Sequence, residues 1–258
     1  MTTVQDICSI MESFAPTKLA MDWDNVGLML GKKDREVKKI LLALDLTQEV
    51  VDQALASEVQ MIITHHPAIF KKISHVTDEQ WQQSLLLTLA EHKIAVYSAH
   101  TNYDCALEGV NDCLANKLGL INIKTLEDET GLGREGLVES TNLFDFACKV
   151  KRILACDYVT YADAHKNVQR VAVCGGAGGE LISLCLAKGV DTLVTGDIKY
   201  HTAQDAVFQG LNIVDAGHQA TERIAIEYLR ARLEIYASMH GLDLEFTQAN
   251  ESLVLQHV

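Results

Sequence analysis

The sequence predicts an α/β fold in which two similar open α/β domains follow each other along the chain. Short continuous apolar runs alternate with segments of helical apolar spacing, first within residues 1–125 and again within residues 126–258. This alternation is typical of parallel sheets covered by helices on both faces. The length of 258 residues suits two modest domains, and 48% hydrophobic with 22% charged residues is the balance of an ordinary globular protein.

In the first domain the pattern predicts one amphipathic helix and then alternating strands and helices. The first helix is expected over residues 4–14, where Val4, Ile7 and Met11 share a face before the break at Pro16. Apolar runs predict strands over residues 40–46, 59–63 and 94–98. Helical spacing predicts helices over residues 47–57, 78–92 and 109–118. Thr47 is a suitable N-cap for the second helix.

Between residues 119 and 140 the chain becomes polar and glycine-rich, which predicts the domain boundary near residue 125. The alternation then returns. Apolar runs predict strands over residues 168–174, 192–195 and 212–214. Helical spacing predicts helices from Glu180, from His201, and from His218 to about Met239. The second domain is therefore expected to resemble the first, although no sequence repeat establishes a duplication.

The net charge of −13, from 35 acidic and 22 basic residues, argues against a nucleic-acid-binding protein. Affinity for nucleic acid depends largely on Lys and Arg neutralising phosphates, and an acidic field repels the phosphate backbone. The basic clusters, Lys71-Lys72 and residues 149–152, are short. A nucleic-acid role is therefore the third of the candidate functions, behind the two given below.

Seven scattered cysteines, odd in number and without a Cys-x-x-Cys pair, argue against a disulfide framework and against a zinc finger. We expect most of them to be small buried apolar residues in a reducing cytosol. The N-terminus lacks the pattern of a secretory signal, and no apolar stretch reaches the roughly 18 residues of a membrane span. The sequence therefore predicts a cytoplasmic protein without membrane segments.

Polar side chains follow the predicted strands, at the end of the sheet where ligands bind in open α/β folds. They are Asp45, His65-His66, His100 with Asp104, Asp197, and residues 215–218. Five of the ten histidines, at positions 65, 66, 100, 201 and 218, lie just past strands or at helix starts. This placement makes the strand ends the candidate site.

His65-His66 comes directly after an apolar strand, and Pro67 restricts His66 to extended backbone. Neighbouring strand side chains point to opposite faces, so the pair suits two ions side by side better than one ion chelated by both rings. The alternative is an ordinary polar strand exit.

His100 and Asp104 follow the next strand, and the carboxylate of Asp104 can bridge two cations. The alternative is an Asx-turn that stabilises the loop.

His218 and Glu222 are four residues apart at a helix start, so both lie on one helix face. A helix presents two metal ligands in this way, although a solvated His-x-x-x-Glu face is the common alternative. Together the imidazoles and carboxylates suit divalent Zn, Mn, Fe or Ni better than a thiolate site would. The loop over residues 174–179, Cys-Gly-Gly-Ala-Gly-Gly, is either a phosphate cradle at a helix N-terminus or a tightly packed turn.

These motifs, taken in order, resemble the Nif-three-like family, whose bacterial members are labelled GTP cyclohydrolase type-two homologues. The resemblance covers about residues 4–245, in the short form without an inserted middle domain. It rests on Trp23-Asp-Asn-Val-Gly-Leu28, Thr64-His-His-Pro67, His100-Thr-Asn-Tyr-Asp104, Thr195-Gly-Asp-Ile-Lys-Tyr-His201 and Gly217-His-x-x-x-Glu222.

The resemblance implies a two-domain subunit with two divalent metal ions and a ring-shaped homohexamer. By motif, the implied ligands are His65, His66, Asp104, His218 and Glu222, with His100 beside them and Asp104 as the bridge. Because these ligands come from both halves of the chain, we expect the dinuclear site in the cleft between the two domains.

The expected function is that of a metal-dependent hydrolase acting on a nucleotide-like or other small phosphorylated substrate. His100 or His201 is a candidate proton shuttle, and Lys199 or the glycine loop is a candidate phosphate contact. The alternative is a metal-binding regulatory or scaffold hexamer without turnover. The sequence leaves open whether the protein is an enzyme.

Overall fold

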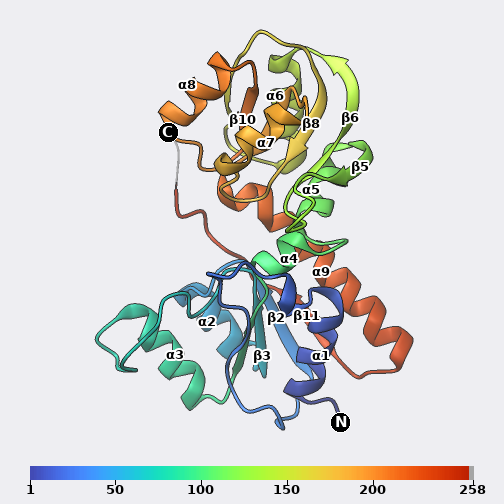
Figure 1. Ribbon diagram of the computed structural model, residues 1–258. Helices are drawn as coiled ribbons and strands as arrows, with labels where there is room; N and C mark the ends of the chain where they lie inside the picture. The colour runs from blue at the N-terminus through green and yellow to red at the C-terminus, as the bar shows by residue number, and fades with distance from the viewer. Residues whose placement is uncertain (256–258) are drawn as a thin grey trace. The chain divides into compact units, whose positions relative to one another are not determined.

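The computed structural model describes residues 1–255, which divide into two compact units (Figure 1). The first unit comprises residues 1–106 and 226–252, and the second comprises residues 107–225 with the described residues 253–255. The boundary predicted at residue 125 falls inside the second unit. Helix α9, His218–His240, begins in the second unit and ends in the first, so the chain returns to the unit where it started.

The first unit contains a five-stranded sheet in the order β1-β4-β3-β2-β11. Its strands are β1 Gly27–Leu30, β2 Lys39–Ala43, β3 Met61–Thr64, β4 Ala95–Ser98 and β11 Glu245–Gln248. The predicted strands β2, β3 and β4 are parallel, as expected. The sequence did not predict β11, which adds a further parallel strand beside β2, or β1, which pairs antiparallel with β4.

Helices cover both faces of this sheet (Figure 1). The helices of this unit are α1 Val4–Phe14, the short 3-10 turn η1 Thr17–Leu19, α2 Gln48–Ala56, α3 Trp81–Glu91, α4 Thr101–Cys105 and the C-terminal part of α9. Leu41, Ile62 and Val96 share one buried cluster with apolar side chains of α2 and α3. Thr47 caps α2 as predicted, because its side chain accepts a hydrogen bond from the N–H of Val50 at 3.2 Å.

The second unit contains a six-stranded mixed sheet in the order β5-β6-β8-β9-β10-β7. Its strands are β5 Ile121–Thr125, β6 Arg134–Thr141, β7 Thr160–Ala162, β8 Val168–Val173, β9 Thr192–Thr195 and β10 Asn212–Asp215. The predicted strands β8, β9 and β10 are parallel, whereas β5, β6 and β7 pair antiparallel and were not predicted. The expectation of a purely parallel sheet is therefore corrected to a mixed one.

The helices of the second unit are α5 Val110–Leu118, α6 Leu143–Leu154, the 3-10 turn η2 Gly179–Leu181, α7 Ile182–Ala187, α8 Tyr200–Phe208 and the start of α9. Leu114 of α5 and Phe146 of α6 share a buried cluster with Val171 and Val173 of β8. These two helices thus cover one face of the sheet, with the parallel strands at its centre.

The polar segment around residues 127–134 is an ordered part of the second unit rather than a loose linker. Arg134, 2% exposed, donates to both carboxylate oxygens of Asp112, at 2.6 and 2.9 Å. It also donates to the carbonyl oxygens of Gly131 and Gly133, at 2.7 and 2.8 Å. The buried guanidinium therefore gathers this segment onto α5.

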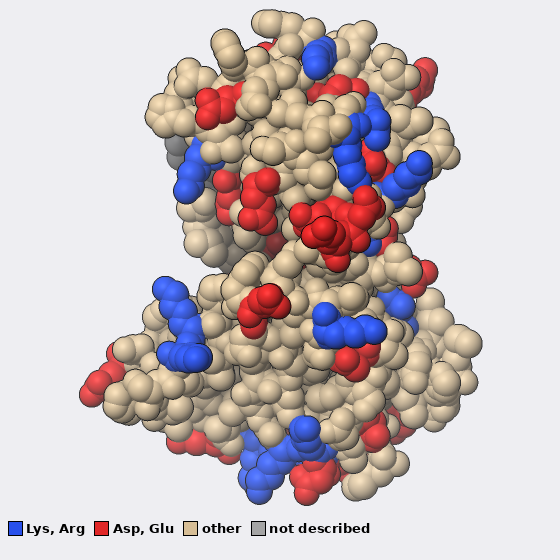
Figure 2. Space-filling view, viewed as in Figure 1, with Lys and Arg blue, Asp and Glu red and all other residues tan. Residues whose placement is uncertain are grey.

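The charge distribution and the cysteines can be compared with the sequence-based expectations. On the face shown in Figure 2, Lys and Arg lie in small groups among acidic side chains and form no continuous basic surface. All seven cysteines are free thiols; four are buried, Cys8 and Cys156 are partly buried, and Cys148 is exposed. Within residues 1–255, every helix falls short of the length and apolar character that crossing a membrane requires.

The loop before β1 is fixed to α4 by one buried carboxylate, Asp24. Its Oδ1 accepts from the ring Nδ1 of His100 at 2.9 Å, and its Oδ2 accepts from the N–H and the hydroxyl of Thr101, at 3.1 and 2.5 Å. Burial opposes the ionisation of Asp24, but the hydrogen bonds from His100 and Thr101 outweigh it and lower the pKa to about 2 from 3.8. Asp24 is thus a charged anchor joining segments 76 residues apart.

We expect Asp24 to contribute stability that disappears in acid. Because its pKa is lower in the folded protein, the contribution is fully present above pH 3.8 and is lost as the pH falls through about 2. The shift corresponds to about 2 kcal/mol. Urea unfolding of wild type and Asp24→Asn in EDTA should show this difference at pH 5 and lose most of it near pH 2. A difference independent of pH would contradict the assignment; exposed Asp22→Asn is the matched control.

Candidate metal centre

His65 and His66 lie where the chain leaves β3, and both rings turn to the same side. The N–H groups of His65 and His66 donate to the carbonyl oxygens of Ala43 and Leu44, at 3.1 and 2.9 Å, so the chain continues beside β2 past the strand end. The two ring centroids are 5.1 Å apart. Strand alternation therefore does not extend beyond Thr64, which brings the two imidazoles together.

His100 joins this pair from the end of β4. Its ring centroid lies 5.3 Å from that of His65 and 5.7 Å from that of His66. One ring nitrogen of each of the three histidines lies within 4.8 Å of the others. Asp104, in α4, is also buried here, with its Oδ1 3.6 Å from Nε2 of His65. The first unit thus gathers three imidazoles and one carboxylate, all of them among the residues selected from the sequence.

Each of these three histidines has its Nδ1 held by an oxygen atom. The acceptors are the carbonyl oxygen of Ala99 for His65 at 2.8 Å, Asp45 for His66 at 2.8 Å, and Asp24 for His100 at 2.9 Å. A carbonyl oxygen only accepts hydrogen bonds, so Nδ1 of His65 carries the proton. In the neutral ring this leaves the lone pair on Nε2, the form in which histidine binds a metal ion.

The second unit repeats this arrangement with His218 and Glu222 at the start of α9. Nε2 of His218 lies 3.2 Å from Oε2 of Glu222, and Nδ1 of His218 lies 2.8 Å from Oδ2 of Asp197. Glu222 is 3% exposed. Asp215, at the end of β10, accepts from the N–H groups of Gly217 and Ile198, at 2.9 and 2.8 Å. It thereby fixes the two loops that carry His218 and Asp197.

The glycine loop packs against this pair rather than forming an open phosphate cradle at Gly176. Gly176 has φ +63°, and a Cβ there would collide with Oε1 of Glu222 and lie 3.1 Å from Nε2 of His218. Its N–H donates to the hydroxyl of Thr221 at 3.0 Å, and its carbonyl accepts from the N–H of Gly196 at 2.7 Å. Of the two interpretations of this loop, the structure favours the tightly packed turn.

Two of the predicted residues lie apart from these groups. His201, in the first turn of α8, is exposed and its ring contacts Tyr200 at a centroid distance of 5.2 Å. Within the described residues it belongs to no cluster of three metal-capable side chains. Lys199 is also exposed.

The sequence did not identify Asp24 as the partner of His100, although Asp24 lies in the Trp23-Asp-Asn25 motif. Asp45 and Asp197 were noted at strand ends without a role.

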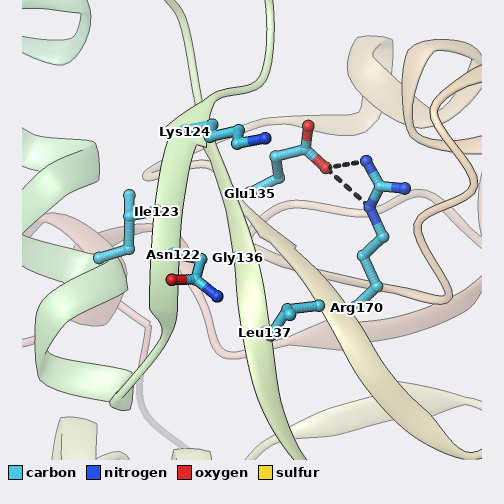
Figure 3. A pocket seen from close by; sticks show the side chains of 7 residues that line it. All are labelled: Asn122, Ile123, Lys124, Glu135, Gly136, Leu137 and Arg170. Carbon is cyan, nitrogen blue, oxygen red and sulfur yellow. Dashed lines mark hydrogen bonds and ion pairs between the residues drawn. The ribbon is translucent and has the colours of Figure 1, made fainter.

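A pocket of about 560 Å³ lies elsewhere on the second unit, over β5, β6 and β8 (Figure 3). It is lined by Asn122, Ile123, Lys124, Glu135, Gly136, Leu137 and Arg170. Arg170 donates twice to Oε2 of Glu135, at 2.9 and 2.7 Å, so this carboxylate is already engaged. The pocket contains none of the predicted ligands.

The donor atoms present fit a divalent metal ion. Imidazole Nε2 atoms and carboxylate oxygens are the ligands that borderline ions such as Zn²⁺ take in proteins. A histidine ligand is usually supported by an oxygen atom that accepts a hydrogen bond from its other ring nitrogen. The described residues therefore include His, Asp and Glu groups that can hold a metal.

Comparison with known proteins gives the family. The family model DUF34/NIF3 (NGG1p interacting factor 3) matches residues 2–252. A "GTP cyclohydrolase 1 type 2 homolog" of Lactococcus lactis is 39% identical over 235 residues, covering 88% of this chain and 91% of that protein. "NIF3-like protein 1" of Drosophila melanogaster is 34% identical, covering 83% of this chain and 75% of that protein.

Solved structures agree. A Staphylococcus aureus hypothetical protein matches with a TM-score of 0.94 and 28% identity, covering 99% of each chain. Reduced HcgD from Methanocaldococcus jannaschii matches with a TM-score of 0.84 and 32% identity, covering 97% of this chain and 98% of that one. The resemblance inferred from five sequence motifs is thereby confirmed, and the chain belongs to the DUF34/NIF3 family.

Proposed function

We propose that this protein is a metal-dependent hydrolase with a dinuclear centre, acting on a nucleotide-like or other small phosphorylated substrate. The observation that carries the proposal is the hydrogen bond from Nδ1 of four separate histidines to an oxygen acceptor. Exposed His92 has the same kind of contact, from Nδ1 to the carbonyl oxygen of Thr88 at 2.8 Å, so the bond alone does not mark a ligand. It supports the proposal because His65, His66 and His100 also converge, with one ring nitrogen of each within 4.8 Å of the others.

The proposed ligands are His65, His66, Asp104, His218 and Glu222, with His100 beside them. The first unit supplies His65, His66, His100 and Asp104, and the second supplies His218 and Glu222. A single histidine and a single glutamate make an incomplete coordination shell for a tightly bound ion. We therefore propose that both groups serve the same pair of ions, with Asp104 as the bridging carboxylate.

When bound, two divalent ions would supply Lewis acidity and an activated water. The protein would supply proton transfer and orientation. His100 is partly exposed, with 17% of its side chain accessible, and Asp24 fixes the orientation of its ring through Nδ1. We propose His100 as the proton shuttle, with the exposed His201 as the second candidate. The printed names of the bacterial relatives extend the proposal to GTP as a substrate to test.

We further propose that the chain assembles as a ring-shaped homohexamer. Large apolar side chains are exposed on two helices, Tyr200 and Phe208 on α8 at 75% and 92%, and Ile235 and Met239 on α9 at 61% and 78%. Exposed large apolar side chains of this kind are available for contact with another copy of the chain. Light scattering on the purified protein should give about six times the 28.4 kDa chain mass; a monomeric mass would contradict the assembly.

Metal analysis tests the centre directly. Wild-type protein should carry about two divalent ions per chain, and His65→Ala and His218→Ala should each lower that ratio because each removes one Nε2 ligand. Asp197→Asn should weaken metal affinity by about 10–100-fold, since the carboxylate that orients His218 is lost. Gly176→Ala should act in the same direction, because its Cβ would displace Glu222.

The matched control for these variants is His165→Ala. His165 also lies beside an aspartate, with Nδ1 3.7 Å from Asp163, but 89% of its side chain is exposed. Its replacement should leave the metal ratio unchanged. Equal metal content in wild type and His218→Ala, with both proteins folded by circular dichroism, would rule out the proposed ligand set.

Turnover is tested with metal-loaded protein, GTP and a panel of damaged nucleotides, with product formation followed by chromatography. We expect activity above the background set by His65→Ala. A His100→Ala variant should lose about 10²-fold or more in rate, the usual contribution of general acid–base catalysis by a histidine. Absence of turnover in a protein that binds metal and is stabilised by it would instead favour the regulatory or scaffold role.

A further inference from the structure

The metal proposal leaves one sequence motif without a role, the exposed tryptophan of Trp23-Asp-Asn25. Trp23 is 62% exposed and Phe70 is 48% exposed. Their ring centroids are 6.1 Å apart in an edge-to-face arrangement, and each also contacts His100, at 6.1 Å from Trp23 and 6.3 Å from Phe70. Trp23 and Phe70, the aromatic pair, therefore stand directly beside the candidate metal ligands.

The aromatic pair is held in place from both sides. Asp24 fixes the Trp23 loop to α4 through three hydrogen bonds, and the N–H of Met21 donates to the hydroxyl of Thr101 at 3.0 Å. The side-chain amide of Asn25 donates to the carbonyl oxygen of Ile69 at 2.5 Å. The two loops that carry the rings are thus tied to each other and to the histidine cluster.

The placement of these two side chains suits binding of a planar ring of a ligand. Single exposed apolar residues are ordinary, but these two rings are fixed at 75° to each other. A planar heteroaromatic ring can stack on the face of one of them while the other ring contacts its edge. Any of the bases can stack on an aromatic side chain, because every base has a π-face.

Two positive charges adjoin the aromatic pair in the sequence. Lys71 and Lys72 directly follow Phe70 and both are exposed, in a chain whose net charge is −13. An aromatic surface next to basic side chains is the combination that binds the bases and phosphates of nucleotides. The short basic cluster thus complements the ligand class that the rings suggest.

We propose that Trp23 and Phe70 bind the planar base of a mononucleotide and that Lys71 and Lys72 bind its phosphate. This assignment rests on the proposed function, because it places the ligand beside the proposed metal centre. It goes beyond that function by naming the residues that recognise the ring and those that recognise the anion.

Tryptophan fluorescence reports on Trp23 directly. The chain has two tryptophans, and Trp81, at 69% exposure in the first turn of α3, can be replaced by phenylalanine so that Trp23 is the remaining fluorophore. Zinc-loaded Trp81→Phe protein is titrated with guanosine, GMP and ribose 5-phosphate. Guanosine and GMP should quench Trp23 with saturation, and ribose 5-phosphate should not.

Calorimetry with the same three compounds separates the two contacts. Trp23→Ala and Phe70→Ala should each weaken guanosine and GMP binding by about tenfold or more, whereas Trp23→Phe should retain most of the affinity. Trp81→Ala is the matched control, because Trp81 is a similarly exposed tryptophan whose replacement should leave the affinity unchanged. Replacing Lys71 and Lys72 together by alanine should reduce the affinity for GMP to that for guanosine.

Equal GMP affinity in wild type, Trp23→Ala and Phe70→Ala would overturn the assignment, as would failure of zinc-loaded wild type to bind either guanosine or GMP. If Trp23→Ala changed the native mass of the assembly but not the GMP affinity, the rings would be a contact between copies of the chain. That result would also overturn the assignment. GMP binding that depends on the rings, without turnover of any nucleotide, would support the assignment while contradicting the hydrolase. Metal content is measured on every variant, so that weaker binding caused by loss of the metal ions can be distinguished from weaker binding caused by loss of the aromatic contact.

Discussion

One interaction recurs at every histidine of the candidate site, the hydrogen bond from Nδ1 to an oxygen acceptor. It is 2.8 Å at His65, His66 and His218 and 2.9 Å at His100. Without it a neutral imidazole could adopt either tautomer, and one of the two would present an N–H to a cation. The acceptor thus converts a titratable side chain into a fixed ligand atom, and the surrounding structure is arranged to supply four such acceptors.

The fold supplies these acceptors where chain segments leave parallel strands. Ala99 follows β4 directly, Asp45 lies two residues past the end of β2, and Asp197 lies two residues past the end of β9. In parallel sheets these ends lie at one edge, so a ligand from one strand finds its acceptor on the next. Asp24 is the exception. It comes from a loop before β1, and its hydrogen bonds to α4 both orient His100 and fix the loop that carries Trp23.

The sequence predicted the parts of the structure that are governed by local pattern. Strands β2, β3, β4 and β9 are continuous apolar runs, and the histidines that follow β3 and β4 could be selected because strand ends are where ligands bind. Strand β6 was missed because it begins with Arg134 and Glu135, polar residues that are buried only through ion pairs with distant partners. For the same reason Asp24 could not be paired with His100, since 76 residues separate them and only the tertiary fold joins them.

The burial of Asp104 gives the proposed ions a second consequence, for stability. Its Oδ1 lies 3.6 Å from Nε2 of His65, and both side chains are buried. Burial of a carboxylate is unfavourable unless a positive charge or hydrogen bonds compensate it. Under the proposed function a divalent ion would supply such a charge. An ion that binds only the folded chain stabilises it by an amount that grows with the logarithm of its concentration relative to its Kd. The proposed ions would therefore contribute to the stability of the fold as well as to the chemistry of the site.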